Sequence, residues 1–146
     1  MRKTYRLAVE NGIDMARRLP LSDVRPTQLY LSSEKLAGVL EWFDFDEPNY
    51  EPLPAFEHDG EWYLADGHTR AFAASLAGAE TLRIEHDESV REEYDFEVYL
   101  RCLEWCEDAG IETIDDLHGR VVSPNAYQEL WIDRCQRVSD DAHETA

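Results

Sequence analysis

The fold of this chain is decided by the stretch Glu61-Trp62-Tyr63-Leu64-Ala65-Asp66-Gly67-His68-Thr69-Arg70-Ala71-Phe72-Ala73-Ala74-Ser75-Leu76-Ala77-Gly78. An apolar run ends at Asp66-Gly67, and a helical pattern that Gly78 closes begins at once, so we expect a strand, a tight turn and a helix. The first N–H groups of a helix have no partner within it, and the helix dipole is positive at that end. The stretch therefore predicts a phosphate-binding site at the turn.

Each residue of this turn has an expected role. We expect Arg70 to hold phosphate through two hydrogen bonds and Gly67 to let the backbone approach, while His68 and Thr69 add donors. Asp66 is expected to hold the turn as a hydrogen-bond acceptor, with an outer ligand of Mg²⁺ as the alternative. A surface salt bridge is the alternative for Arg70, because the protein is strongly acidic.

The composition limits the possible partners. The 146 residues include 32 acidic and 14 basic ones, and the formal net charge of -18 resembles that of halophilic proteins. Direct DNA binding is not expected, because no cluster of Lys and Arg is present to bind a phosphate backbone. No apolar run has transmembrane length and the N-terminus lacks an apolar signal core, so we expect a cytoplasmic protein without a membrane partner.

The pattern along the chain predicts an α/β (α+β) fold, a small mixed sheet with packed helices, over residues 20–87. Pro20 and Pro26 bound an edge strand and turn, and a helix begins after a cap at Ser32 or Ser33. Residues 53–56 and 62–64 form a β-hairpin around Asp-Gly, and residues 81–86 return as a strand. Residues 1–19 are expected to form a helical segment packed on this domain.

The remaining residues predict a C-terminal helical extension over 88–138 and a frayed tail over 139–146. Cys102, Cys106 and Cys135 lie on apolar helix faces without a Cys-x-x-Cys knuckle, so we expect core residues and no metal site.

At Asp66-Gly67-His68-Thr69-Arg70 the chain resembles the ParB/sulfiredoxin superfamily, whose members share a small α/β fold and bind nucleotide phosphates at this turn. The resemblance covers residues 20–87. The most similar branch, which includes free serine kinases, carries Asp-Gly-His-His-Arg and differs only at Thr69. Partition proteins have Gly-Glu-Arg-Arg there. Sulfiredoxins have a reactive cysteine where this chain has His68, so sulfiredoxin chemistry is not expected.

The resemblance also implies a catalytic base, at which this chain departs from the family pattern. The kinase-like branch has a Glu two residues after an early Pro, and the place counted from Pro26 is Gln28. An amide does not accept a proton at any useful pH. Glu34 would substitute if the loop folded back, but we favour its role as a first-turn carboxylate that interacts with the helix dipole.

Two functions follow as expectations from the resemblance. The first is a nucleotide-dependent phosphotransferase or nucleotide hydrolase that uses ATP, ADP or CTP with Mg²⁺ and acts on a small-molecule acceptor. The alternative is a non-enzymatic ParB-like partition or regulatory module that uses nucleotide as a switch and docks a protein partner on its C-terminal helices. A nuclease is a weaker third possibility, because no cluster of metal-binding carboxylates with a Lys is evident.

Overall fold

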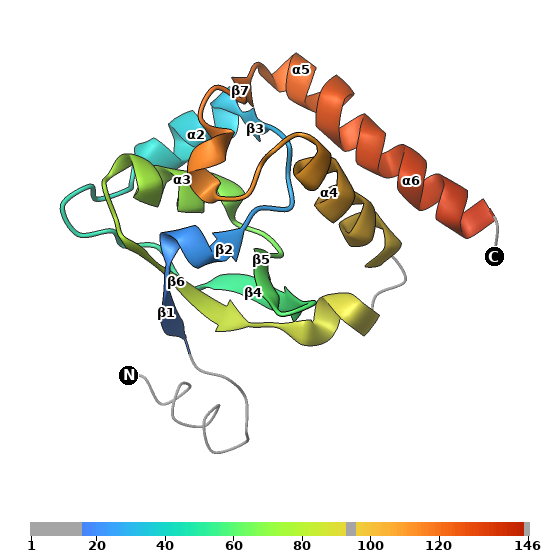
Figure 1. Cartoon of the computed structure of the whole chain (residues 1–146). Helices are drawn as coiled ribbons and strands as arrows, with labels where there is room; N and C mark the ends of the chain where they lie inside the picture. The colour runs from blue at the N-terminus through green and yellow to red at the C-terminus, as the bar shows by residue number, and fades with distance from the viewer. Residues whose placement is uncertain (1–15, 93–95, 145–146) are drawn as a thin grey trace.

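A curled, mixed five-stranded sheet forms the base of the fold in this computed structural model, which describes residues 16–92 and 96–144 (Figure 1). The strand order is β1-β6-β4-β5-β2, and the β4–β6 and β2–β5 pairs are parallel while the others are antiparallel. The strands are β1 (Arg17–Pro20), β2 (Val24–Arg25), β4 (Leu53–His58), β5 (Glu61–Leu64) and β6 (Thr81–His86). The predicted α/β class, the hairpin and the returning strand are confirmed.

The hairpin has the turn that its sequence predicts. Asp59 and Gly60 both have positive φ, 52° and 81°, as a two-residue turn between twisted strands requires. The resulting register pairs Phe56 with Tyr63, and Phe56 is fully buried. The hairpin therefore carries the chain along β5 directly to the turn at Gly67.

Two helices lie side by side next to strand β3 (Leu31–Ser32) (Figure 1). Helix α2 (Ser33–Leu40) begins at Ser32, whose hydroxyl accepts the Lys35 N–H, as the capping pattern predicts. Helix α3 (His68–Leu76) follows the turn and buries its alanine-rich face. Small residues on this face let α3 pack closely against α2, η3 (Ile114–Leu117) and β3, and the short turn after β5 sets the position of its N-terminus.

The second half of the chain packs on the same core. It contains η2 (Glu88–Glu92), α4 (Phe96–Asp108), η3 (Ile114–Leu117), β7 (Val121–Val122), α5 (Pro124–Tyr127), the π-helical η4 (Gln128–Ile132) and α6 (Asp133–Glu144). Strand β7 pairs in parallel with β3 (Leu31–Ser32) of the first half. One continuous hydrophobic cluster joins the sheet, α3, α4 and η3. The domain boundary at residue 87 stays a prediction, but the core is shared across it.

Both ends of the chain differ from expectation. Residues 17–19 were predicted to end a helical segment; instead they form β1, because their backbone pairs with β6 through Arg17–Ile84 and Leu19–Leu82. The rest of that prediction, residues 1–15, lies outside the described residues. Residues 139–144 were predicted to fray and instead continue helix α6.

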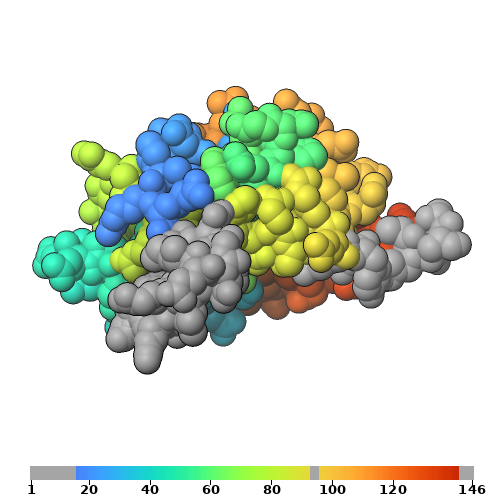
Figure 2. All heavy atoms as spheres, turned by 90° about the horizontal axis from the view of Figure 1, so that it is seen from below, coloured from blue at the N-terminus to red at the C-terminus, as the bar shows by residue number. Residues whose placement is uncertain are grey.

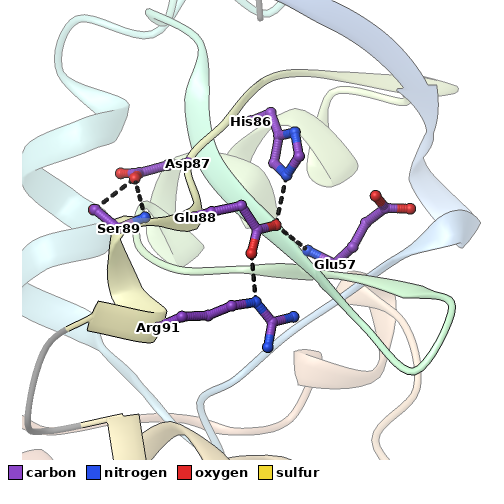
Figure 3. A network of polar contacts seen from close by, with 6 residues as sticks. All are labelled: Glu57, His86, Asp87, Glu88, Ser89 and Arg91. Atoms are coloured by element: carbon purple, nitrogen blue, oxygen red, sulfur yellow. Dashed lines mark hydrogen bonds and ion pairs between the residues drawn. The ribbon is translucent and has the colours of Figure 1, made fainter. Parts of the chain in front are cut away.

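The polar contacts around Glu88 fasten η2 to the sheet (Figure 3). Its carboxylate accepts the Glu57 N–H at 3.1 Å and pairs with His86 and Arg91. Partial burial would raise the pKa of Glu88, but these hydrogen bonds outweigh it and lower the pKa to about 2. Seen from below, η2 lies on the same face as β1, β2 and the hairpin, and α6 appears only at the edge (Figure 2).

None of the helices among the described residues is long and apolar enough to cross a membrane.

Candidate phosphate-binding site

The turn at the start of α3 can hold only glycine at position 67. Gly67 has φ of +84°, and a Cβ there would lie 2.7 Å from Leu53 Cδ2 and 3.1 Å from Arg70 Nη2. The N-cap therefore has no side chain that could accept the N–H groups of the first helical turn. Those N–H groups remain for a ligand or for water, and the Arg70 guanidinium lies beside them.

A cavity of about 350 Å³ opens at this turn. Its size is within the range of small-molecule sites. Gln28 and all five predicted turn residues line it, so the structure brings together six of the seven site residues expected from the sequence. The lining residues are Gln28, Lys35, Gly38, Val39, Trp42, Asp66, Gly67, His68, Thr69, Arg70 and Tyr127. Glu34 is exposed in the first turn of α2 and does not line the cavity.

The charge of the cavity is opposite to that of the protein. Arg70 and Lys35 line it, and Asp66 is the only carboxylate among the described residues that line it. Within the described ranges neither Arg70 nor Lys35 forms an ion pair, although acidic residues outnumber basic ones by 32 to 14. The salt bridge considered as the alternative for Arg70 is therefore not found in the described part of the chain. Two cations left without carboxylates in so acidic a protein are available to an anion.

A second cavity of the protein is lined by several acidic side chains. This larger cavity, of about 460 Å³, lies between the hairpin and α4, and four carboxylates line it beside Arg25: Asp59, Glu61, Glu104 and Glu107. Such a lining repels phosphate. The smaller cavity is therefore the better candidate for an anionic ligand, despite its size.

His68 has a fixed tautomer and no charge at neutral pH. The Thr27 backbone N–H donates to His68 Nε2 at 2.8 Å, so Nε2 is the acceptor and the ring proton is on Nδ1. Burial lowers the pKa of His68 to about 4, against the opposing effect of Asp66. The ring thus ties the Thr27 loop to α3. The Nδ1–H group is buried without a partner among the described residues, and its role as a donor to phosphate stays a prediction.

Gln28 and Tyr127 form a second wall of the cavity. Gln28 Nε2 donates to the Tyr30 carbonyl at 2.9 Å and to Tyr127 Oη at 3.3 Å. Burial raises the pKa of Tyr127, although the hydrogen bond from Gln28 opposes this rise. Neither group is a base at neutral pH. Gln28 therefore makes a positioning contact with Tyr127 and is not placed as a proton acceptor.

Lys35 and Tyr127 also line the cavity, although neither was expected there from the sequence. Lys35 Nζ lies 5.2 Å from the centre of the Tyr127 ring. One signal for Lys35 was available, because the chain contains only two lysines, Lys3 and Lys35. Tyr127 is 60 residues or so beyond the turn, and only the tertiary fold brings it there.

Asp66 is the residue that could hold a metal ion in this cavity. It is exposed, and its carboxylate makes no hydrogen bond within the described residues, so the turn-holding role expected for it is not observed there. An outer contact with a Mg²⁺ ion carried by a nucleotide fits a single exposed carboxylate. Elsewhere in the described chain, no group of three or more potential metal ligands is found. Cys102 and Cys106 are core residues, as predicted, and burial raises the pKa of Cys106 to about 12.

Comparison with known proteins gives two similar solved structures. Protein Atu1540 from Agrobacterium tumefaciens is 23% identical with a TM-score of 0.40, over 49% of this chain and 38% of that one. Sulfiredoxin from Arabidopsis thaliana is 21% identical with a TM-score of 0.36, over 53% of this chain and 94% of its own. Identities and scores this low support no statement about function. No family model and no curated protein matches the chain.

Proposed function

We propose that this protein binds the phosphates of a nucleotide, ATP, ADP or CTP with Mg²⁺, in the cavity at the start of α3. One observation carries the proposal: among the described residues, one carboxylate, Asp66, lines this cavity, together with two cations without carboxylate partners, Arg70 and Lys35, and the open N-terminus of α3. Helix N-termini and guanidinium groups both favour phosphate.

Each part of the cavity has a role in this proposal. The N–H groups that follow Gly67 and the Thr69 hydroxyl donate to phosphate oxygens, and Arg70 binds a phosphate through two hydrogen bonds. Lys35 adds a second positive charge. Asp66 orients the Mg²⁺ that accompanies the phosphates, which removes the repulsion that its carboxylate would otherwise exert.

Isothermal titration calorimetry tests the proposal with ADP, ATP and CTP in molar KCl and Mg²⁺. We expect binding of at least one nucleotide and a loss of about tenfold or more for Arg70→Ala, because a hydrogen-bonded charge contact is worth about 1.5 to 3 kcal/mol. Arg101→Ala is the matched control, since it removes the same charge from an exposed site on α4 that does not line the cavity. Equal affinity of both variants would refute the proposal.

The residues at the cavity favour a nucleotide switch over phosphotransfer. Gln28 stands where a base would be needed, and Glu34 does not line the cavity. Phosphotransfer or hydrolysis therefore depends on Asp66, the one carboxylate that the described part of the chain places in the cavity. A turnover assay with each nucleotide separates the two functions: release of phosphate at catalytic rates, abolished in Asp66→Asn, would establish an enzyme, and binding without turnover would establish a switch.

A further inference from the structure

One face of α2 gives the cavity a second end with a different chemistry. Lys35, Gly38, Val39 and Trp42 are three, one and three residues apart, the spacing that places side chains on one helix face. The Trp42 N–H donates to the Val39 carbonyl at 3.2 Å, so the helical turn continues to Trp42. Seven residues at 1.5 Å each put Lys35 and Trp42 about 10 Å apart along this face. A cation and an aromatic ring therefore line one cavity at separate positions.

The Trp42 position offers a flat apolar surface that the protein covers only in part. The residue is 46% exposed, and its ring meets only the tilted ring of Phe43, with centroids 5.9 Å apart, among the ring contacts of the described residues. Beside it, Gly38 lines the cavity, and a Cβ at Gly38 would meet no atom within 4 Å. Glycine within a helix costs about 0.5 to 1 kcal/mol relative to alanine, and here it leaves open space next to the indole.

We propose that Trp42 is the base-binding residue of this cavity: the heterocycle of a nucleotide stacks on the indole over Gly38, while its phosphates reach Lys35, Arg70 and the start of α3. The inference rests on the proposed function and adds the residue that binds the base of the nucleotide, which would make the site prefer a nucleotide to an inorganic or sugar phosphate. Base–aromatic stacking accepts every base, so Trp42 selects for the presence of a base and not for its identity.

Two ligands with the same phosphates, one with a base and one without, test this inference. Calorimetry in molar KCl with Mg²⁺ compares ATP with tripolyphosphate. We expect the wild-type protein to bind ATP the more tightly, and Trp42→Ala to weaken ATP by about tenfold while tripolyphosphate affinity stays unchanged. Phe45→Ala is the matched control, because Phe45 is an equally exposed aromatic residue, 45%, that does not line the cavity.

Gly38→Leu is the second variant. It places an apolar side chain beside Trp42 at a position where a Cβ would meet no atom within 4 Å, and it favours the helix, so we expect an unchanged or raised melting temperature together with a loss of ATP affinity. A loss of binding with that thermal stability cannot come from misfolding.

The outcomes separate the two proposals. If wild type binds tripolyphosphate and Trp42→Ala binds ATP as wild type does, the phosphate site stands and the base-binding inference is overturned. If Trp42→Ala weakens both ligands equally, the residue does not contact a base and the inference is also overturned. If wild type binds neither ligand, the proposed function itself fails.

Discussion

The contacts of His68 make the stability of the folded protein fall as the pH changes from neutral to mildly acidic. Its ring is 2% exposed and accepts the Thr27 N–H through Nε2, so protonation would break this bond and bury a charge. Its pKa is about 4 in the folded protein and 6.5 in the unfolded chain. The unfolded state therefore binds the proton first as the pH falls. The stability from neutral His68 is complete above pH 6.5 and is lost as the pH falls towards 4.

The size of the effect follows from this pKa difference. Over the whole window the loss is about 3 kcal/mol, and between about pH 7.5 and about pH 5 it is about 2 kcal/mol. The lower pH still lies above the pI of about 4.4, which limits precipitation. His68→Gln is the comparison, because the Gln carbonyl oxygen can accept the same Thr27 N–H but does not titrate.

Urea unfolding of wild type and His68→Gln at both pH values, in molar KCl, measures this contribution. Other carboxylates and histidines titrate in both proteins and cancel in the difference. We expect wild type to lose about 2 kcal/mol more than His68→Gln on acidification. Equal losses of stability in the two proteins would show that His68 is not a buried neutral acceptor. The hydrogen bond by which His68 ties the Thr27 loop to α3 would then be contradicted.

Three further substitutions test the parts of the fold that hold the site. Gly67→Ala should lower stability by about 2 kcal/mol and weaken nucleotide binding, since its Cβ would clash with Leu53. Gly78→Ala is the control, because Gly78 has a similar positive φ but a Cβ there meets no atom within 4 Å, so this substitution should cost less. Equal melting temperatures of the two variants would contradict this prediction. Glu88→Gln should lower the free energy of unfolding by about 1 kcal/mol at neutral pH, a figure reduced for the partial exposure of Glu88. In urea unfolding, this difference between wild type and variant should vanish as the pH falls from 4.5 towards 2. A difference that does not change with pH would contradict the lowered pKa of Glu88. Asp116→Ala should cost about 1 kcal/mol by removing the acceptor of the capping box at η3, and an unchanged denaturation midpoint would show that the cap contributes nothing.

Local sequence signals predicted much of the fold correctly. The Asp-Gly turn of the hairpin and the Ser32 cap of α2 both occur where short-range patterns placed them. The turn at Gly67 was also predicted, because an apolar run, a turn signal and a helical pattern follow one another directly. These features depend on contacts within a few residues, which a single sequence displays.

The failures have a common cause, which is dependence on distant segments. Arg17 and Leu19 form a strand only because β6, more than 60 residues later, offers an edge. Tyr127 enters the cavity because α5 packs beside β3, and Gln28 contacts it across 99 residues of sequence. The open space beside Gly38 depends on every neighbour of the cavity. No local pattern encodes such contacts.

The phosphate site can be tested most directly at the backbone of the turn itself. Amide ¹H–¹⁵N spectra of the wild-type protein, recorded as ATP and Mg²⁺ are added in molar KCl, report on the N–H groups at the start of α3. We predict that the largest shifts occur at Gly67, His68, Thr69 and Arg70, because their N–H groups bind the phosphates. Largest shifts at Asp59 and Glu61 beside the larger cavity, or no shifts at all, would contradict a phosphate site at the N-terminus of α3.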